Sequence, residues 1–460
     1  MRKSRTFLGL VALGLFVIGC SGIKKNNQRV DVGQEGQINL NVTKKVLSNG
    51  LTILISENHK LPIFSYYTYY KVGGKYETDG FTGSTHFLEH MMFKGAKKYG
   101  PGEFDRLVEG NGGSNNAFTT NDHTVYYENL PSEHLEQIVD LEADRMQNLL
   151  LEEKSFENER NVIFEERKMR YENSDRGKIY LRMMKEMFKG TPYGTSVIGK
   201  LEDLKTVSRK QMYDYFKLHY APNNAILVIV GDVDAQKTIS LIEKKYGEVP
   251  ASKESEKLKE AQLKKLGFDF KNTYNREFKL KGQTPIPMFM LAFKGTKVGT
   301  PDSYTLDILG SILGGGASSY LSENYVLGKR PTLSQIYASN YTLQDSGVFF
   351  VGGELLKKTS LNSTKESLYK NLVKSCSEAI TPRALEKVKN QYLVDMLSSL
   401  DTNAGVARFI GDREFYYNDY NFYKKEMDLY NAVTIESLKN ACQKYLKRSS
   451  SHFLSIWNKN

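Results

Sequence analysis

The chain has 460 residues, which is too many for one ordinary hydrophobic core and predicts two or more domains. Its hydrophobic content of 40% and charged content of 25% are ordinary for a soluble globular protein. The formal net charge of +11 could favour nucleic acid or anionic lipid, but acidic residues are interleaved with the basic ones. A solvated surface is therefore the better interpretation, and no nucleic-acid partner is expected.

The first nineteen residues have the features of a signal peptide: a basic start and an apolar run, Leu8 to Ile18, too short to span a bilayer. The run ends at Val17-Ile18-Gly19-Cys20, which resembles the bacterial lipobox, whose cysteine becomes lipidated. We therefore expect an exported lipoprotein, anchored through Cys20 and a flexible tether (residues 20–40) to the outer membrane or the periplasmic face of a bacterial envelope. A plain signal peptide with an incidental cysteine is the alternative. Export also argues against a nucleic-acid partner.

Residues 41–250 predict a first domain that mixes strands and helices. A hairpin is expected around Asn49-Gly50, because both residues tolerate the positive φ of a tight turn. A helix is expected from about Thr85 to Phe93, with Ser84 or Thr85 as its N-cap. The remaining expected elements are strands at 63–72, 115–120, 124–128 and 225–230 and helices at 103–109, 132–149 and 153–171.

A charged segment with few large apolar residues predicts a linker over residues 251–268, and residues 269–460 then repeat the plan of the first half. A helix and strand that follow Val207-Ser208 are weakly matched by a helix and strand that follow Val433-Thr434. The predicted fold is α+β, with two homologous domains, each a mostly antiparallel sheet packed with helices. Further elements are expected as strands at 288–293, 334–341, 347–353 and 452–457 and helices at 303–313, 360–376, 382–397 and 434–446.

The segment from His86 to His90 carries the strongest chemical signal. On a helix, His86 and His90 are four residues apart and project from one face, which suits two nitrogen ligands of one zinc ion. Glu89 can reach a zinc-activated water as catalytic base, and this H-x-x-E-H order is the inverzincin signature. A helix with solvated histidines is the alternative. Apolar neighbours such as Phe87 and Leu88 predict a buried helix instead, in which unpaired imidazoles would be costly.

A catalytic zinc needs a third protein ligand, and the predicted helix over 156–167 offers candidates. Glu159 and Glu166 are seven residues apart and share one face, and Val162 and Ile163 are expected to turn that face inward. Glu166 is then the third ligand, and Glu159 orients a ligand or an arginine. From the spacing alone, an ordinary surface position is equally compatible with either glutamate.

These motifs resemble those of the pitrilysin–insulysin inverzincin metallopeptidases, especially the branch of mitochondrial processing peptidase and its bacterial relatives. The resemblance implies that Glu166 is the distal zinc ligand. It also implies that the strand around Asn116 and Ala117 binds extended peptide by adding it as a further strand. The resembling stretches are Gly83–Gly95, Asn116–Thr120, Thr124–Tyr127, Glu159–Glu166, Pro192–Gly194 and Tyr220–Asn224.

The second half departs from the family pattern after its glycine-rich turn at 313–319. Family members that are complete in one chain carry an arginine and, seven residues later, a tyrosine, which hold the substrate carbonyl. Gly328 and Gln335 occupy those places here, and neither can do this, although Lys329 or Arg330 could substitute. The resemblance therefore implies a homologous partner chain, or a second copy of this chain, that supplies the Arg/Tyr pair.

The expected function is zinc-dependent hydrolysis of peptides or unfolded segments, with Glu89 as the base. The alternatives are a non-catalytic assembly or scaffold subunit of the same fold and an exported zinc-binding protein. An intact Glu89 favours the enzyme. The sequence leaves open the substrate, the partner, and whether Cys376 and Cys442 form a disulfide.

Overall fold

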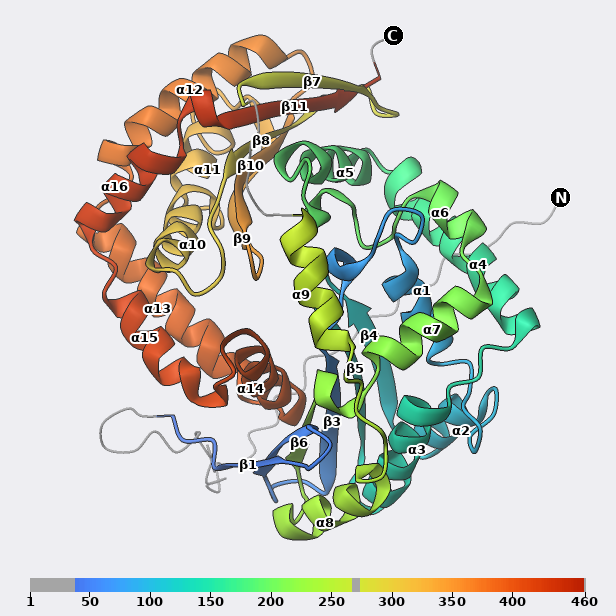
Figure 1. The fold of residues 1–460 in the computed structure, drawn as a ribbon. Helices are drawn as coiled ribbons and strands as arrows, with labels where there is room; N and C mark the ends of the chain where they lie inside the picture. Colours follow the sequence, from blue (N-terminus) through green and yellow to red (C-terminus); the bar gives the residue numbers. More distant parts are fainter. Residues whose placement is uncertain (1–37, 267–273, 459–460) are drawn as a thin grey trace, which may run out of the picture. The chain divides into compact units, whose positions relative to one another are not determined.

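Two sheets, one in each half of the chain, carry the fold of this computed structural model, which describes residues 38–266 and 274–458 (Figure 1). The strands of the first half are β1 (Val42–Val46), β2 (Thr52–Glu57), β3 (Ile63–Tyr70), β4 (Ser114–Thr119), β5 (Thr124–Pro131) and β6 (Ala225–Gly231). Those of the second half are β7 (Arg276–Lys281), β8 (Met288–Lys294), β9 (Leu333–Thr342), β10 (Gly347–Leu355) and β11 (Ser451–Trp457). The expected signal peptide and nearly all of the expected tether lie outside the described residues.

The two sheets share one topology. Their strand orders are β1-β2-β6-β3-β5-β4 and β7-β11-β8-β10-β9, so without β1 the two orders correspond strand by strand. In each sheet one pair is parallel, β2 with β6 and β7 with β11, and the other neighbours are antiparallel. Strands β6 and β11, one from each parallel pair, follow helices that begin with a capping box, at Ser208 and at Thr434. The predicted α+β fold with two mostly antiparallel sheets is confirmed.

Helices cover these sheets in both halves. The helices of the first half are α1 (Ser84–Met91), α2 (Glu103–Gly110), α3 (Leu135–Asn148), α4 (Glu153–Arg167), α5 (Asp175–Met187), α6 (Leu201–Thr206), α7 (Arg209–His219), α8 (Ala235–Tyr246) and α9 (Ser255–Leu266). Those of the second half are α10 (Pro301–Gly314), α11 (Tyr320–Tyr325), α12 (Leu361–Glu378), α13 (Pro382–Ser399), α14 (Asn403–Tyr417), α15 (Tyr423–Asn431) and α16 (Ile435–Tyr445). The segment expected to be a linker is largely helical, because α9 occupies most of it.

One helix from each half packs on the sheet of the other half (Figure 1). Helix α5 packs against β8 and β11, and its Met183 and Met184 share a core with Met290 and Leu454. Helix α14 packs against β3 and β6, where Gly411 allows the ring of Tyr69 to approach the helix backbone closely. The two halves are therefore joined through buried apolar surface.

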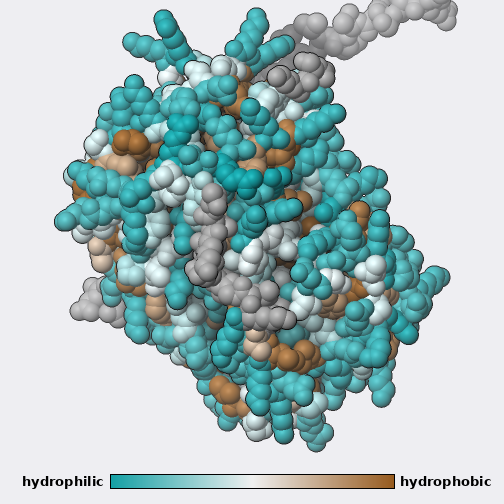
Figure 2. Space-filling model, turned by 45° about the horizontal axis from the view of Figure 1, so that its top comes forward, coloured by the Kyte–Doolittle hydropathy of each residue, from teal (hydrophilic) through white to brown (hydrophobic). Residues whose placement is uncertain are grey.

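A disulfide joins Cys376 of α12 to Cys442 of α16, which closes a chain segment of 66 residues. The sequence alone had left this pairing open. The face of the molecule shown in Figure 2 is largely hydrophilic, with hydrophobic groups in small separate areas. Within 38–266 and 274–458, no helix has the length and apolar character that crossing a bilayer requires.

Candidate metal centre

Helix α1 brings His86, Glu89 and His90 to the candidate site. The predicted N-cap is wrong: the helix begins after Gly83, whose φ of 85° places it in the left-handed region, and Ser84 and Thr85 lie inside the helix. A side chain at Gly83 would also collide with the carbonyl oxygen of Ile198. The first amides are satisfied by Glu77, whose carboxylate accepts hydrogen bonds from the N–H groups of Gly83 and Thr85, both at 2.7 Å.

Helix α4 lies against α1 and carries Glu159 and Glu166. The ring of Phe156 stacks on that of Phe87 with the centroids 4.6 Å apart, and both side chains are buried. Ile163 completes the buried stripe, whereas Val162 is 48% exposed, so the expectation that Val162 faces inward is wrong. Phe156, Glu159, Ile163 and Glu166 follow one another at helical spacing, which turns both carboxylates toward α1.

The three predicted ligands converge. The Nε2 atoms of His86 and His90 lie 3.6 and 3.4 Å from Oε2 of Glu166. One ligand atom from each residue lies within 4.8 Å of the other two. The structure thus brings together two imidazoles and one carboxylate from sequence positions that are 80 and 76 residues apart.

The carboxylates around these rings favour a positive charge at the site, although His90 would have to give up a proton to bind a metal ion. Burial lowers the pKa of His86 to about 4, so this imidazole is neutral and can offer a nitrogen lone pair. Burial also acts to lower the pKa of His90, but its hydrogen bonds to Glu159 and Glu166 raise it to about 9. Although burial acts to raise the pKa of Glu166, its contacts with His90 and His86 lower it, so the carboxylate is ionised.

Polar partners hold the ligand side chains in place. His90 Nδ1 lies 3.1 Å from Glu159 Oε2, while Glu159 Oε1 accepts from Lys94 at 2.6 Å. Glu159 therefore lies beside the ring of the candidate ligand His90. Arg170 contacts the other oxygen of Glu166 at 3.1 Å, from a π-helical turn (Lys168–Glu172) that follows α4. The roles of Lys94 and Arg170 were missed in the sequence, although each lies four residues after a candidate ligand.

The carboxylate of Glu89 lies close enough to His90 and Glu166 to interact with their charges, but it is not one of the three candidate ligands. Its Oε2 accepts a hydrogen bond from the hydroxyl of Thr119, the last residue of β4. Burial raises the pKa of Glu89, and the Thr119 bond opposes this only in part. A carboxylate with a raised pKa, held in one orientation, is suited to accept and return a proton. No sequence pattern pointed to Thr119 in this role.

Asn116 and Ala117 lie on β4, which is the edge strand of the first sheet and, among the described strands, pairs with β5 alone. Opposite them on β5 are Tyr127 and Tyr126. The amide of Ala117 is bonded to the side-chain oxygen of Asn116 at 2.8 Å rather than to another strand. The outer edge of β4 can therefore accept a further strand.

The four residues considered for the Arg/Tyr pair of the second half lie on β9 or in the turn before it. Gln335 is half-buried on β9 opposite Glu354 of β10, and Gly328 lies in the turn after α11. Lys329 and Arg330 are exposed in the same turn. These four positions therefore provide no Arg/Tyr pair.

The donor set fits zinc. Buried Oε2 of Glu166 has no hydrogen bond among the described residues, although both Nε2 atoms lie within 3.6 Å of it, and such a buried oxygen is costly unless a ligand meets it. Two imidazole nitrogens and one carboxylate oxygen are a zinc-type donor set that leaves a coordination position for a reactant. The side chains could therefore hold one zinc ion with water or a carbonyl beside Glu89.

Comparisons with known proteins find relatives of the chain along most of its length. Residues 52–200 match the family described as Insulinase (Peptidase family M16), and residues 206–392 match Peptidase M16 inactive domain. Zinc protease PqqE of Helicobacter pylori is 32% identical over 379 residues, which cover 80% of this chain and 82% of that protein. Mitochondrial-processing peptidase subunit beta of Lentinula edodes is 27% identical, with 87% and 86% covered. The crystal structure of a protease from Helicobacter pylori superimposes with a TM-score of 0.82 at 27% identity, covering 90% of this chain and 99% of that chain.

Proposed function

Because the chain belongs to peptidase family M16, we propose that it is a zinc-dependent endopeptidase that hydrolyses peptides or unfolded segments. The observation that carries the proposal is the convergence of His86, His90 and Glu166 with Glu89 alongside. In this proposal the first three residues hold zinc, and Glu89 is the catalytic base. The name of the relative PqqE as a zinc protease supports the choice of metal.

Each of these side chains has a separate task. When bound, zinc supplies Lewis acidity, which activates water and polarises a peptide carbonyl. Glu89 takes a proton from the attacking water and passes it to the leaving amine, while Thr119 holds the carboxylate in orientation. Glu159 fixes the ring of His90 through Nδ1, which leaves Nε2 pointing at Glu166.

The substrate would bind in an extended conformation along β4. Backbone groups at Asn116 and Ala117 would pair with the peptide backbone, after the Ala117 amide exchanges its bond to the Asn116 side chain for one to the peptide. Such pairing recognises backbone rather than side chains, so it suits peptides and unfolded segments and excludes folded helices.

We also propose that full activity needs a homologous chain, or a second copy of this one. Gly328 and Gln335 give the chain no Arg/Tyr pair, and a relative covering most of the chain is named as a subunit. The same observation favours a second candidate function, a non-catalytic subunit of the same fold. The two differ in one respect: the second predicts no zinc-dependent hydrolysis with any partner.

The lipid anchor at Cys20 and the location on a bacterial envelope remain proposals. The disulfide between Cys376 and Cys442 supports an oxidising compartment outside the cytosol, because disulfides rarely persist in reducing cytosol. The full chain is expected in the membrane fraction, and Cys20→Ala is expected to release it. Equal membrane retention of both chains would rule out Cys20 as the anchor.

Hydrolysis of a mixed peptide library tests the proposed activity. The zinc-loaded chain, alone and with a co-expressed homologue that carries the Arg/Tyr pair, should cleave peptides and lose this activity with a chelator. Glu89→Gln should keep zinc and reduce turnover by about a thousandfold, since it removes the base. Glu165→Gln is the matched control, because Glu165 is exposed on α4 and its carboxylate pairs with Lys168 at the surface. Wild-type turnover in Glu89→Gln would show that the assigned base is wrong.

A further inference from the structure

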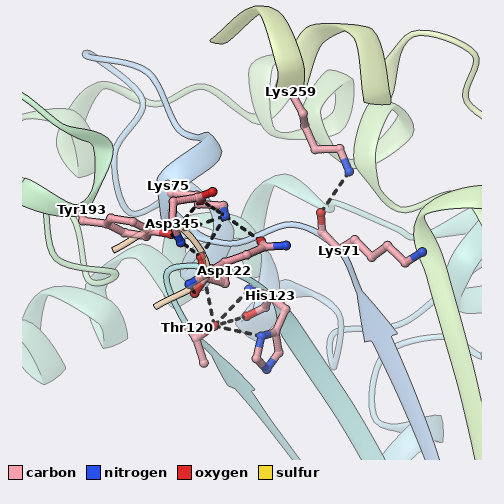
Figure 3. Close-up of polar contacts among 9 residues, drawn as sticks. Lys71, Lys75, Thr120, Asp122, His123, Tyr193, Lys259 and Asp345 are labelled. Atoms are coloured by element: carbon pink, nitrogen blue, oxygen red, sulfur yellow. Dashed lines mark hydrogen bonds and ion pairs between the residues drawn. The ribbon is translucent and has the colours of Figure 1, made fainter. Parts of the chain in front are cut away.

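A buried cluster of charges joins the two halves of the chain (Figure 3). Lys75 lies in the 3-10 turn after β3, Asp122 between β4 and β5, and Gln344 and Asp345 in the turn between β9 and β10. The ammonium of Lys75 contacts Asp122 at 2.9 Å, Asp345 at 2.7 Å and the Gln344 side-chain oxygen at 2.7 Å. All three of its N–H donors therefore have an oxygen partner.

The cluster is closed on its remaining sides. The hydroxyl of Tyr193 donates to Asp122 at 2.7 Å and accepts from the Asp345 amide at 3.2 Å. The second oxygen of Asp122 accepts from the Gln344 amide at 3.0 Å. Lys75 and Asp122 are each 1% exposed, whereas Asp345 is 31% exposed. Because a buried ammonium is stable only when it is paired, Lys75 depends on both carboxylates.

From this cluster, a first path leads to Glu89 through β4. The amide of Gly74 donates to the Thr120 carbonyl at 3.1 Å, and the amide of Lys75 donates to the Asn121 carbonyl at 2.9 Å. The turn that carries Lys75 is thus bound to the end of β4. Thr119, the residue before Thr120, donates to the carboxylate of Glu89.

A second path leads from the same turn to the helix that carries Glu89. Glu77 follows Lys75 by two residues, and its two carboxylate oxygens accept from the Gly83 and Thr85 amides at the start of α1. The backbone from Gly74 to Glu77 therefore supports both the helix that presents Glu89 and the hydroxyl that orients its carboxylate. That backbone is itself held by the buried end of Lys75.

We propose that Asp345, which comes from the half without metal-ligating residues, is a positioning residue that holds Glu89 in its productive orientation through Lys75. This role rests on the function proposed above, since it assigns to Asp345 an effect on the base of that reaction. Asp345 touches neither the substrate-binding edge of β4 nor the three ligands. Its loss should therefore disturb the chemical step more than substrate binding or zinc binding.

Two isosteric variants of the full zinc-loaded chain test this role. Asp345→Asn removes the charge that faces Lys75. Glu414→Gln is the matched control: Glu414 is buried, contacts Lys44 of the first half at 2.5 Å and makes none of the contacts of the cluster given above. Asp345→Asn is expected to lower kcat about tenfold, with KM and zinc content within twofold of wild type, because small misplacement of a reacting group slows chemistry sharply. Glu414→Gln should leave kcat within twofold.

Deuterium exchange provides a readout that needs no activity. Peptides covering residues 74–90 should take up deuterium about tenfold faster in Asp345→Asn than in wild type, and Glu414→Gln should not change them. If the wild-type chain cleaves no peptide, the proposed function fails, while this comparison still decides whether Asp345 supports the start of α1. Unchanged exchange in Asp345→Asn would overturn the proposal.

A double variant tests the route through Lys75. If Asp345 acts through Lys75, the combination of Lys75→Gln and Asp345→Asn should lower kcat no further than the worse single change. Multiplied losses in the double variant would overturn the route. A kcat loss in Glu414→Gln equal to that in Asp345→Asn would show a general effect of loosening the two halves and would equally overturn it.

Discussion

The stacked pair Phe87–Phe156 offers a sharp test of how the candidate site is built. Phe156 is 1% exposed and Phe87 is fully buried, and their rings join the helix of the two histidines to the helix of the two glutamates. Truncating a buried Phe to Ala costs about 3–5 kcal/mol, so Phe156→Ala should lower the free energy of unfolding by about 4 kcal/mol. Because Glu159 and Glu166 lie on the same helix as Phe156, zinc affinity should also fall, by about tenfold or more.

Both quantities are measurable on one sample, by urea unfolding of the metal-free chain and by competition with a chromophoric zinc chelator. Phe349→Ala is the matched control: Phe349 is fully buried in the core of the second half, away from both helices. It should cost a similar free energy of unfolding and leave zinc affinity unchanged. If Phe156→Ala destabilises the chain without weakening zinc, contact between α1 and α4 is not what places Glu166.

Two further predictions concern stability. Replacing Cys376 and Cys442 by Ala should lower the free energy of unfolding by about 4 kcal/mol, since the disulfide closes 66 residues. Equal urea midpoints for oxidised and reduced wild-type chain would contradict this. Burial lowers the pKa of His219 to about 3 in the folded chain. Below pH 6.5 this imidazole is therefore protonated in the unfolded chain and neutral in the folded one, so the free energy of unfolding falls as the pH is lowered. His219 should contribute about 2 kcal/mol of that loss at pH 5, and His219→Gln should remove this contribution. If the free energy of unfolding of the variant depends on pH in the same way as that of wild type, the prediction is refuted.

The candidate ligand positions on each helix have local signals, although the resemblance, and not the spacing, singled out Glu166. The spacing of His86 and His90 places both on one helical face, and the seven-residue spacing of Glu159 and Glu166 does the same on the next helix. Convergence of the two helices could not be read from periodicity, and the resemblance to a known family supplied it. The expectation for Val162 was wrong because two adjacent apolar residues do not share a helix face equally, and only Ile163 lies on the buried side.

Other features of the structure were not predicted, because they depend on residues far apart in the sequence. Glu77 replaces the expected N-cap by bonding amides six and eight residues ahead, which no capping pattern describes. The contact of Lys75 with Asp345 spans 270 residues, and neither residue belongs to a motif. Helices α5 and α14 were not predicted, and they are the two that pack on the opposite half's sheet. Most strands of both sheets were predicted, several from continuous apolar runs, but β7, with the charged sequence REFKLK, was missed.

The proposed activity depends on one zinc ion held by His86, His90 and Glu166. The most direct measurement is anomalous diffraction at the zinc absorption edge on crystals of the purified chain. A single strong peak within about 2.3 Å of all three side chains is the result this account predicts. Zinc-saturated crystals with no peak there, or with the only peak at another group of side chains, would contradict it.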